Sequence, residues 1–212
     1  MHWLFAIALM SVPLVVGEMM KKQFQDLPPE LSRKFVHITA AVCAAFLPLL
    51  LSLKQISLLA IAMTPGMLYM HHKGTLRSMS SRSQRSYGDV FFGLGCAGAA
   101  FLANNVPTYV TAVFIMGLAD GLSGLIPTQK TSRLLVTPGT KKPLVGRIVF
   151  FVLTIVIMAI AARFIPIQNV AAVCILLVAL CLTIVEQVSP YGSDNVTVPI
   201  GAALLLNLIH AG

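Results

Sequence analysis

The chain has 212 residues, of which 57% are hydrophobic and only 10% are charged. Its mean hydropathy is +0.87, so it has too little polar surface to cover a soluble globular domain. The formal net charge is +8. The basic residues are dispersed at helix ends without interleaved aromatic residues, which argues against nucleic-acid binding and favours contact with anionic membrane lipids. The composition therefore predicts an all-α polytopic integral membrane helix bundle that forms a single domain over 1–212.

Hydropathy predicts eight transmembrane helices, although seven remain an alternative. The third segment contains Pro65-Gly66, which predicts a kink or an incomplete span. The first segment is expected to be a retained helix, because Lys21 and Lys22 follow the apolar run, whereas the basic residues of a cleaved signal precede it. The predicted spans are 3–19, 35–53, 55–70, 88–104, 106–126, 145–163, 168–186 and 195–210.

The basic residues predict the orientation of these spans. Of the fifteen Lys and Arg residues, only Lys54 and Arg163 lie in the even-numbered loops. Because positive charge is retained on the cytoplasmic side, the odd-numbered loops are expected to be cytoplasmic and both termini to lie outside. We expect a multi-pass protein of the cell (inner or plasma) membrane.

The chain has only seven acidic residues, and all are predicted to lie at or near the cytoplasmic face. A carboxylate within a hydrocarbon span costs about 2.5–3.5 kcal/mol on insertion scales, so it usually faces protein or water and indicates a functional site. Carboxylates supply the oxygen ligands of Mg²⁺, and nearby cations neutralise nucleotide phosphates. We predict a magnesium–nucleotide site centred on Asp120. The other acids at the cytoplasmic ends of spans are Asp89, Glu186 and Asp194.

Structural roles are alternatives for several of these residues. Asp194 could cap the last helix, and Asp89 could interact with the dipole of the helix that it begins. The spacing Gly117-x-x-x-Gly121 favours close packing of helices around Asp120 over contact with a phosphate. The sequence contains neither GxxxxGK[ST] nor GxGxxG.

Two basic segments are expected to flank the acids. Arg33 and His37 lie four residues apart, on one helix face near the headgroups, and Arg33 with Lys34 is predicted to face lipid or phosphate. Interfacial anchoring and helix packing are the alternatives. The second segment is the cytoplasmic loop 127–144, where Pro residues favour turns and Lys141-Lys142 would contribute to the nucleotide site.

Five motifs stand out along the chain: LSRKFVHI at 31–38, RSYGDVFFGLG at 85–95, LADGLSGLI at 118–126, KKPLVG at 141–146 and VEQVSPYGSDNVTVPIGAALL at 185–205. They resemble those of the polyprenol kinase family and occur in the same order. This family includes dolichol kinase, phytol kinase and the CTP-dependent diacylglycerol kinase. The resemblance extends from about Glu18 to the C-terminus and is nearest to the bacterial phytol kinase-like branch, through GSDNVTVP.

The resemblance implies an enzyme that uses a divalent metal, Mg²⁺, to transfer the γ-phosphate of CTP to a lipid alcohol such as phytol or a polyprenol. Asp120, Lys141, Lys142 and Gly146 match family positions associated with nucleotide binding, and Arg33, Lys34 and His37 match an Arg-Lys-x-x-His motif. The chain departs from the family at five positions. Asp89 replaces a frequent Glu, Pro127 replaces a common Gly, and Pro143 and Val145 replace Thr and Glu. Arg147 replaces a common Ser while adding a phosphate-pairing cation.

The predicted mechanism combines the residues with the resemblance. Asp120, with Asp89 or Asp194, would hold the magnesium nucleotide, while Lys141, Lys142 and Arg147 neutralise its phosphates. Glu186, Asp194 or His37 would accept the proton of the lipid hydroxyl. A cytidylyltransferase that makes a CDP-lipid and a non-catalytic lipid-binding membrane protein are the alternatives. The sequence leaves open the acceptor alcohol, the choice of CTP or ATP, and the oligomeric state.

Overall fold

The computed structural model describes residues 1–75, 78, 86–125, 144–164 and 172–211. These residues form helices and contain no β-strand, in agreement with the predicted all-α class. Each of the eight predicted apolar segments contains a helix. The elements in chain order are α1 (His2–Gln23), α2 (Pro29–Phe46), the 3₁₀ turn η1 (Leu47–Leu49), α3 (Leu53–Lys73), α4 (Gly88–Leu102), α5 (Val106–Phe114), the π-helical turn η2 (Ile115–Ala119), α6 (Asp120–Ser123), α7 (Leu144–Ala161), α8 (Ala172–Val188) and α9 (Asp194–Ala211).

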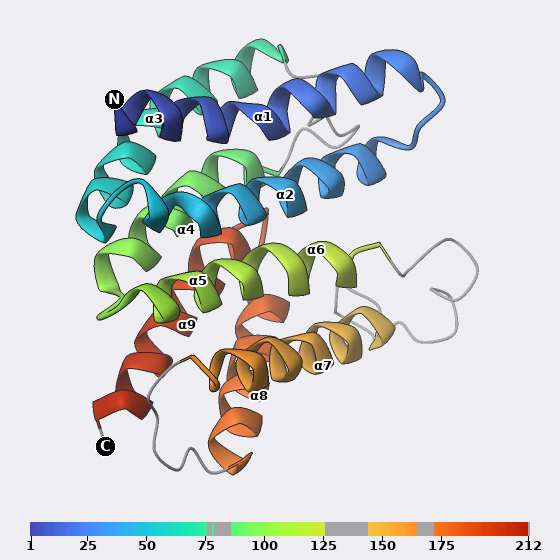
Figure 1. The fold of residues 1–212 in the computed structure, drawn as a ribbon. Helices are drawn as coiled ribbons and strands as arrows, with labels where there is room; N and C mark the ends of the chain where they lie inside the picture. Colours follow the sequence, from blue (N-terminus) through green and yellow to red (C-terminus); the bar gives the residue numbers. More distant parts are fainter. Residues whose placement is uncertain (76–77, 79–85, 126–143, 165–171, 212) are drawn as a thin grey trace.

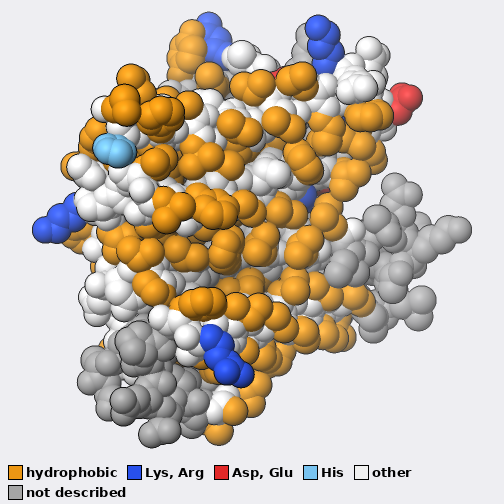
Figure 2. Space-filling model, in the orientation of Figure 1, with side chains coloured by type: hydrophobic (Ala, Val, Ile, Leu, Met, Phe, Trp, Pro, Cys, Tyr) orange, Lys and Arg blue, Asp and Glu red, His pale blue; other side chains and the backbone are white. Residues whose placement is uncertain are grey.

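Three helical segments are long and apolar enough to cross a membrane by length and composition: α1, α7 and the continuous run Val106–Ser123. Helices α4, α8 and α9 are apolar but shorter. Only 17% of the apolar window of α1 and 28% of that of α7 is buried inside the protein. Hydrophobic side chains accordingly cover much of the face seen in Figure 2. The surface is that of a membrane protein, while the count of seven or eight spans and the outside location of the termini stay predictions.

Helix α3 begins and ends at recognisable local signals. The Ser52 hydroxyl accepts from the backbone N–H of Gln55, whose side chain accepts from the backbone N–H of Ser52. The helix ends at Gly74, whose φ of 60° is available to glycine without strain. Between these caps α3 continues through Pro65. The Pro65-Gly66 pair therefore does not divide the third predicted span into two helices.

The helices pack as pairs around a central segment formed by α5, η2 and α6. Helix α1 packs on α2, α3 packs on α4, and α4 also packs on α9, while α2, α7 and α9 contact the central segment (Figure 1). Gly117 and Gly121 face α2. A Cβ at Gly117 would overlap that of Ala41, and a Cβ at Gly121 would overlap Ile38. The small-residue spacing thus serves close helix packing, which brings α2 against Asp120.

Candidate active site

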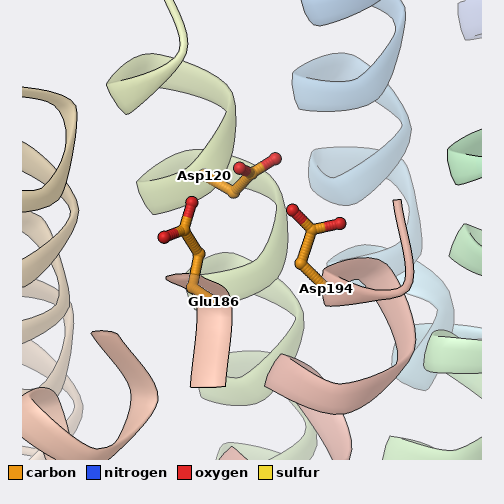
Figure 3. A group of neighbouring side chains, drawn as sticks. All are labelled: Asp120, Glu186 and Asp194. Atoms are coloured by element: carbon orange, nitrogen blue, oxygen red, sulfur yellow. The ribbon is translucent and has the colours of Figure 1, made fainter. Parts of the chain in front are cut away.

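Three carboxylates meet at one end of the helix bundle. Asp120 on α6, Glu186 on α8 and Asp194 on α9 each present an oxygen, and these oxygens lie within 4.8 Å of one another (Figure 3). The three residues are only 7%, 2% and 9% exposed. Residues far apart in the sequence therefore form one buried acidic group, here named the carboxylate cluster.

A change of helical geometry places Asp120 in this cluster. The π-helical turn η2 immediately precedes it, and α6 begins at Asp120. A π-helical turn contains more residues than an α-helical turn and is frequent at functional sites. The Asp120 carbonyl accepts hydrogen bonds from the Gly124 N–H at 3.1 Å and the Ser123 hydroxyl at 3.0 Å.

Local structure also positions the other two carboxylates. Glu186 lies in the last turn of α8, where the side-chain amide of Gln187 donates to it at 2.9 Å. Asp194 is the first residue of α9 and follows a turn in which Tyr191 and Gly192 have φ values of 56° and 85°. The backbone N–H of Asn195 donates to the Asp194 carboxylate at 3.1 Å. Asp194 therefore stabilises the start of a helix and also belongs to the cluster.

Helix α2 brings a cation and a histidine to Asp120. The Lys34 ammonium lies 2.8 Å from the Asp120 carboxylate and donates to the Asp120 carbonyl at 3.0 Å. The Nε2 of His37 lies 3.1 Å from the Met116 carbonyl and 3.7 Å from the Asp120 carboxylate. Because a carbonyl only accepts, this contact assigns the proton to Nε2 and leaves Nδ1 as the acceptor in a neutral ring.

The neighbouring Arg33 makes a different contact. Its guanidinium pairs with Glu30 at 2.7 Å, on the more exposed side of α2, where the two side chains are 30% and 66% exposed. Both residues line the cavity that contains the carboxylate cluster. Of the predicted Arg-Lys-x-x-His motif, the structure brings Lys34 and His37 to Asp120, while Arg33 pairs within its own helix.

Asp89 lies apart from the carboxylate cluster. Its carboxylate pairs with the Nδ1 of His71 at 2.8 Å and accepts from the Val90 N–H at 3.0 Å in the first turn of α4. Asp89 nevertheless lines the same cavity. No motif in the sequence predicted a role for His71. The sequence does contain one indication of the His71–Asp89 pair. His71 lies in the last turn of α3 and Asp89 in the first turn of α4, and the end of one helix usually lies near the start of the next.

The structure describes part of the predicted nucleotide-binding segment. Gly146 is buried in the first turn of α7 and lines the cavity, and Arg147 follows it as a partly buried residue. Lys141, Lys142 and residues 127–143 of the predicted loop lie outside the described residues, and so do the departures Pro127 and Pro143. The described part of the segment thus reaches the cavity at Gly146.

The cavity has a volume of about 780 Å³. At one end, its wall includes the carboxylate cluster, Lys34 and His37. From this end, the cavity extends along apolar side chains between the α1–α2 helix pair and the α3–α4 helix pair. Its volume falls within the range of about 300–1,000 Å³ that is usual for small-molecule sites. The cavity therefore joins a charged region to an apolar one.

These features define a helical membrane protein with a buried acidic site that opens into an apolar cavity. The chain is similar to phytol kinase of Synechocystis sp., with 27% identity over 186 residues that cover 84% of this chain and 78% of that protein. This distant similarity supports a polyprenol or phytol kinase-like family, as the five motifs indicated. No protein-family model matches the chain. No solved structure matches it.

Proposed function

We propose that this protein is a CTP-dependent kinase that phosphorylates an isoprenoid alcohol at the cytoplasmic face of the membrane. The observation that carries the proposal is the meeting of three buried carboxylates with Lys34 and His37 at the end of an apolar cavity. The similarity to a phytol kinase supports the same class of reaction. The site thus offers charged groups for phosphate chemistry beside space for a lipid.

The donor set of the carboxylate cluster fits a divalent cation. Carboxylates so close together repel one another, and burial makes their negative charges costly unless cations compensate them. Lys34 supplies one positive charge at Asp120. Mg²⁺ prefers oxygen ligands and commonly binds through one or two carboxylates together with nucleotide phosphates, whose developing charge it neutralises. We propose Asp120, Glu186 and Asp194 as its ligands, and Asp89 remains a candidate at the same cavity.

The nucleotide is proposed to bind beside this cluster. The Lys34 ammonium donates to two oxygens of Asp120. Because an ammonium has three N–H groups, Lys34 can also donate to a phosphate oxygen while it stays near the carboxylate. Gly146 and Arg147 at the start of α7 would contact the nucleotide together with Lys141 and Lys142. These cations would stabilise the charge of the transferred group, which is the main requirement of phosphoryl transfer.

The proposed reaction displaces CDP from CTP. The hydroxyl oxygen of the alcohol attacks the γ-phosphorus, a new O–P bond forms, and the bond from the γ-phosphorus to the β,γ-bridging oxygen breaks. The hydroxyl proton passes to the Nδ1 of His37, which is available as an acceptor because Nε2 donates to Met116. Glu186 is the alternative acceptor. The products are a lipid monophosphate and CDP.

Transfer of label from γ-labelled CTP to membrane lipids tests this proposal, with γ-labelled ATP in parallel. We expect labelled lipid phosphate from the native chain and its loss in Asp120→Asn. The matched control is Asp26→Asn, because Asp26 is an exposed acid outside the helices. Label from α-labelled CTP in lipid, with release of pyrophosphate, would instead identify a cytidylyltransferase. The absence of any labelled lipid with phytol, polyprenols and diacylglycerol would overturn the kinase proposal.

A further inference from the structure

The residues that line the cavity change from charged to apolar along both α2 and α4. On α2, the lining residues Lys34 and His37 are followed by Ala40 and Ala44, and then by Leu47 in η1. On α4, the lining residue Asp89 is followed by Phe92, Gly93 and Cys96. Both helices therefore lead from the polar end of the cavity to an apolar part, here named the apolar arm.

The apolar arm lies between two helix pairs. Helices α1 and α2 pack on one another, and so do α3 and α4. Each helix turns one stripe of residues to the arm, with the three- and four-residue spacing of a single helical face. The α3 stripe is Ile56, Ala60, Met63 and Met67, and α1 contributes Met10, Pro13 and Leu14.

Small side chains keep the arm open. Ala40 and Ala44 on α2 lie on one wall, and Ala60 on α3 and Gly93 on α4 lie on another. A Cβ at Gly93 would lie 3.2 Å from the Thr64 hydroxyl and 3.6 Å from the Ala60 carbonyl, so this glycine lets α4 pack closely on α3 at the wall of the arm. Met10, Met63 and Met67 complete the wall with unbranched side chains that adapt to the shape of an apolar ligand.

The arm's lining residues farthest along α2 and η1 from the carboxylate cluster lie beside the start of α3, because Leu47 belongs to η1 and Ile56 and Leu59 to the first turns of α3. Figure 1 shows how the chain passes from α2 through η1 to α3. The lining residues Leu47, Ile56 and Leu59 are 4%, 0% and 6% exposed, so this end is packed. At a rise of 1.5 Å per residue, the helix between Lys34 and Leu47 is roughly 20 Å long. That length exceeds one leaflet of hydrocarbon, which is about 15 Å as half of a bilayer core.

We infer that the apolar arm binds the single hydrocarbon chain of the acceptor alcohol and limits its length, an inference that rests on the proposed kinase function. With the hydroxyl at the carboxylate cluster, a chain of roughly 20 Å fills the arm and ends against Leu47 and Ile56. Burial of such a chain is favourable by about 25 cal/mol per Å² of apolar surface removed from water. A long polyprenol exceeds the length of this arm, and a glyceride would have to place two chains where one fits. The acceptor is therefore a single-chain isoprenoid alcohol of moderate length.

Substitutions that shorten the arm test this inference. Ala60→Phe places a large side chain among the lining residues of α3, and Ala40→Phe does so from α2. The matched control for the first is Ala62→Phe, because Ala62 is an exposed residue of the same helix. Val42→Phe is the control for the second, since Val42 is only partly buried and shares a helical face with the exposed Phe35.

The measurement is kcat/KM for geraniol, farnesol, geranylgeraniol and phytol, and for a long polyprenol. In the native chain we expect phosphorylation up to the length of phytol and little with the polyprenol. In Ala60→Phe, kcat/KM should fall about tenfold or more for geranylgeraniol and phytol and less than about twofold for geraniol. Ala40 lies one helical turn after His37, so Ala40→Phe should lower kcat/KM for every alcohol, geraniol included. The controls should keep the native profile. Efficient phosphorylation of the polyprenol, or equal profiles in arm variants and controls, would overturn the inference while leaving the kinase proposal intact.

Crosslinking provides a readout that does not depend on phosphoryl transfer. A long-chain alcohol with a photoreactive group at its far end is irradiated with the purified native protein in detergent, and the labelled peptides are mapped. Labelling near Leu47 and Ile56 that Ala60→Phe abolishes and Ala62→Phe retains supports the arm, even when no alcohol is phosphorylated and the kinase proposal has failed. Labelling confined to outward-facing residues, or unchanged by Ala60→Phe, overturns it.

Discussion

The ammonium of Lys34 lies 2.8 Å from the carboxylate of Asp120, and both side chains are buried, with 13% and 10% exposed. The two residues are 86 positions apart in the sequence. Breaking such a buried ion pair leaves one charge uncompensated, at a cost of about 3–5 kcal/mol. The pair therefore contributes to the folded state as well as to the proposed phosphate site.

Lys34→Met should lower the free energy of unfolding by about 3–5 kcal/mol and abolish lipid phosphorylation. The double variant Lys34→Met/Asp120→Asn should recover most of the stability but no activity, because it removes the uncompensated charge together with a proposed metal ligand. Thermal unfolding in detergent and the transfer assay measure the two effects. Arg33→Met is the control, since its pair with the exposed Glu30 should contribute less than about 1 kcal/mol. Equal destabilisation by both single variants would contradict the assignment.

Mg²⁺ should stabilise the native protein, and loss of a ligand should weaken this effect. We expect Glu186→Gln and Asp194→Asn to raise the Kd for Mg²⁺ or Mn²⁺ by about tenfold or more, because each removes one negatively charged oxygen ligand. The shift of the unfolding temperature with metal concentration gives the Kd. Asp26→Asn should leave it unchanged. The same titration of Asp89→Asn decides whether the acid that pairs with His71 also binds the metal.

His37→Gln should reduce kcat by about 10²–10⁴ with little change in KM for either substrate. The glutamine amide can still donate to Met116, so the variant separates proton acceptance from helix packing. His37 can accept a proton only when its ring is neutral. At low pH, kcat of the native chain should therefore rise as the pH is raised, and this dependence, the acid limb of the pH profile, should disappear in His37→Gln. An acid limb that persists in His37→Gln and disappears in Glu186→Gln would assign the proton to Glu186.

Gly117→Ala should destabilise the protein by about 1–3 kcal/mol and lower activity, because the new Cβ overlaps that of Ala41 and pushes α2 away from Asp120. Adding Ala41→Gly should restore most of both properties. The comparison variant is Gly66→Ala, since a Cβ at Gly66 would meet no atom within 4 Å. Thermal unfolding and transfer of label measure the outcome. A Gly117→Ala protein as stable and active as Gly66→Ala would refute the packing argument.

The sequence was sufficient for the helices and for the identity of the important acids. Apolar runs bounded by charged or turn residues predicted each helix, because hydropathy depends only on local composition. The scarcity of acids singled out Asp89, Asp120, Glu186 and Asp194 as one group. The structure brings the last three together. The Gly117-x-x-x-Gly121 spacing also predicted close helix packing, and α2 fills that space.

The partners of these acids could not be predicted from local patterns. Periodicity shows which residues share a face of one helix, but not which face of another helix lies opposite. For this reason Arg33, Lys34 and His37 looked alike in sequence, although only the latter two contact the segment around Asp120. The separation of Asp89 from the cluster and its pairing with His71 likewise depend on tertiary packing. The π-helical turn before Asp120 had no sequence signal that we recognised.

The position of Asp194 has a consequence for biogenesis. Asp194 opens α9, which follows every other described helix in the chain and packs between α4 and α8. During translation, a chain that has been synthesised only through α8 contains Asp120 and Glu186 without the third carboxylate. The cluster is completed only when α9 has entered the bundle. Assembly of the carboxylate cluster, and of the metal site that we propose on it, is thus coupled to the insertion of α9.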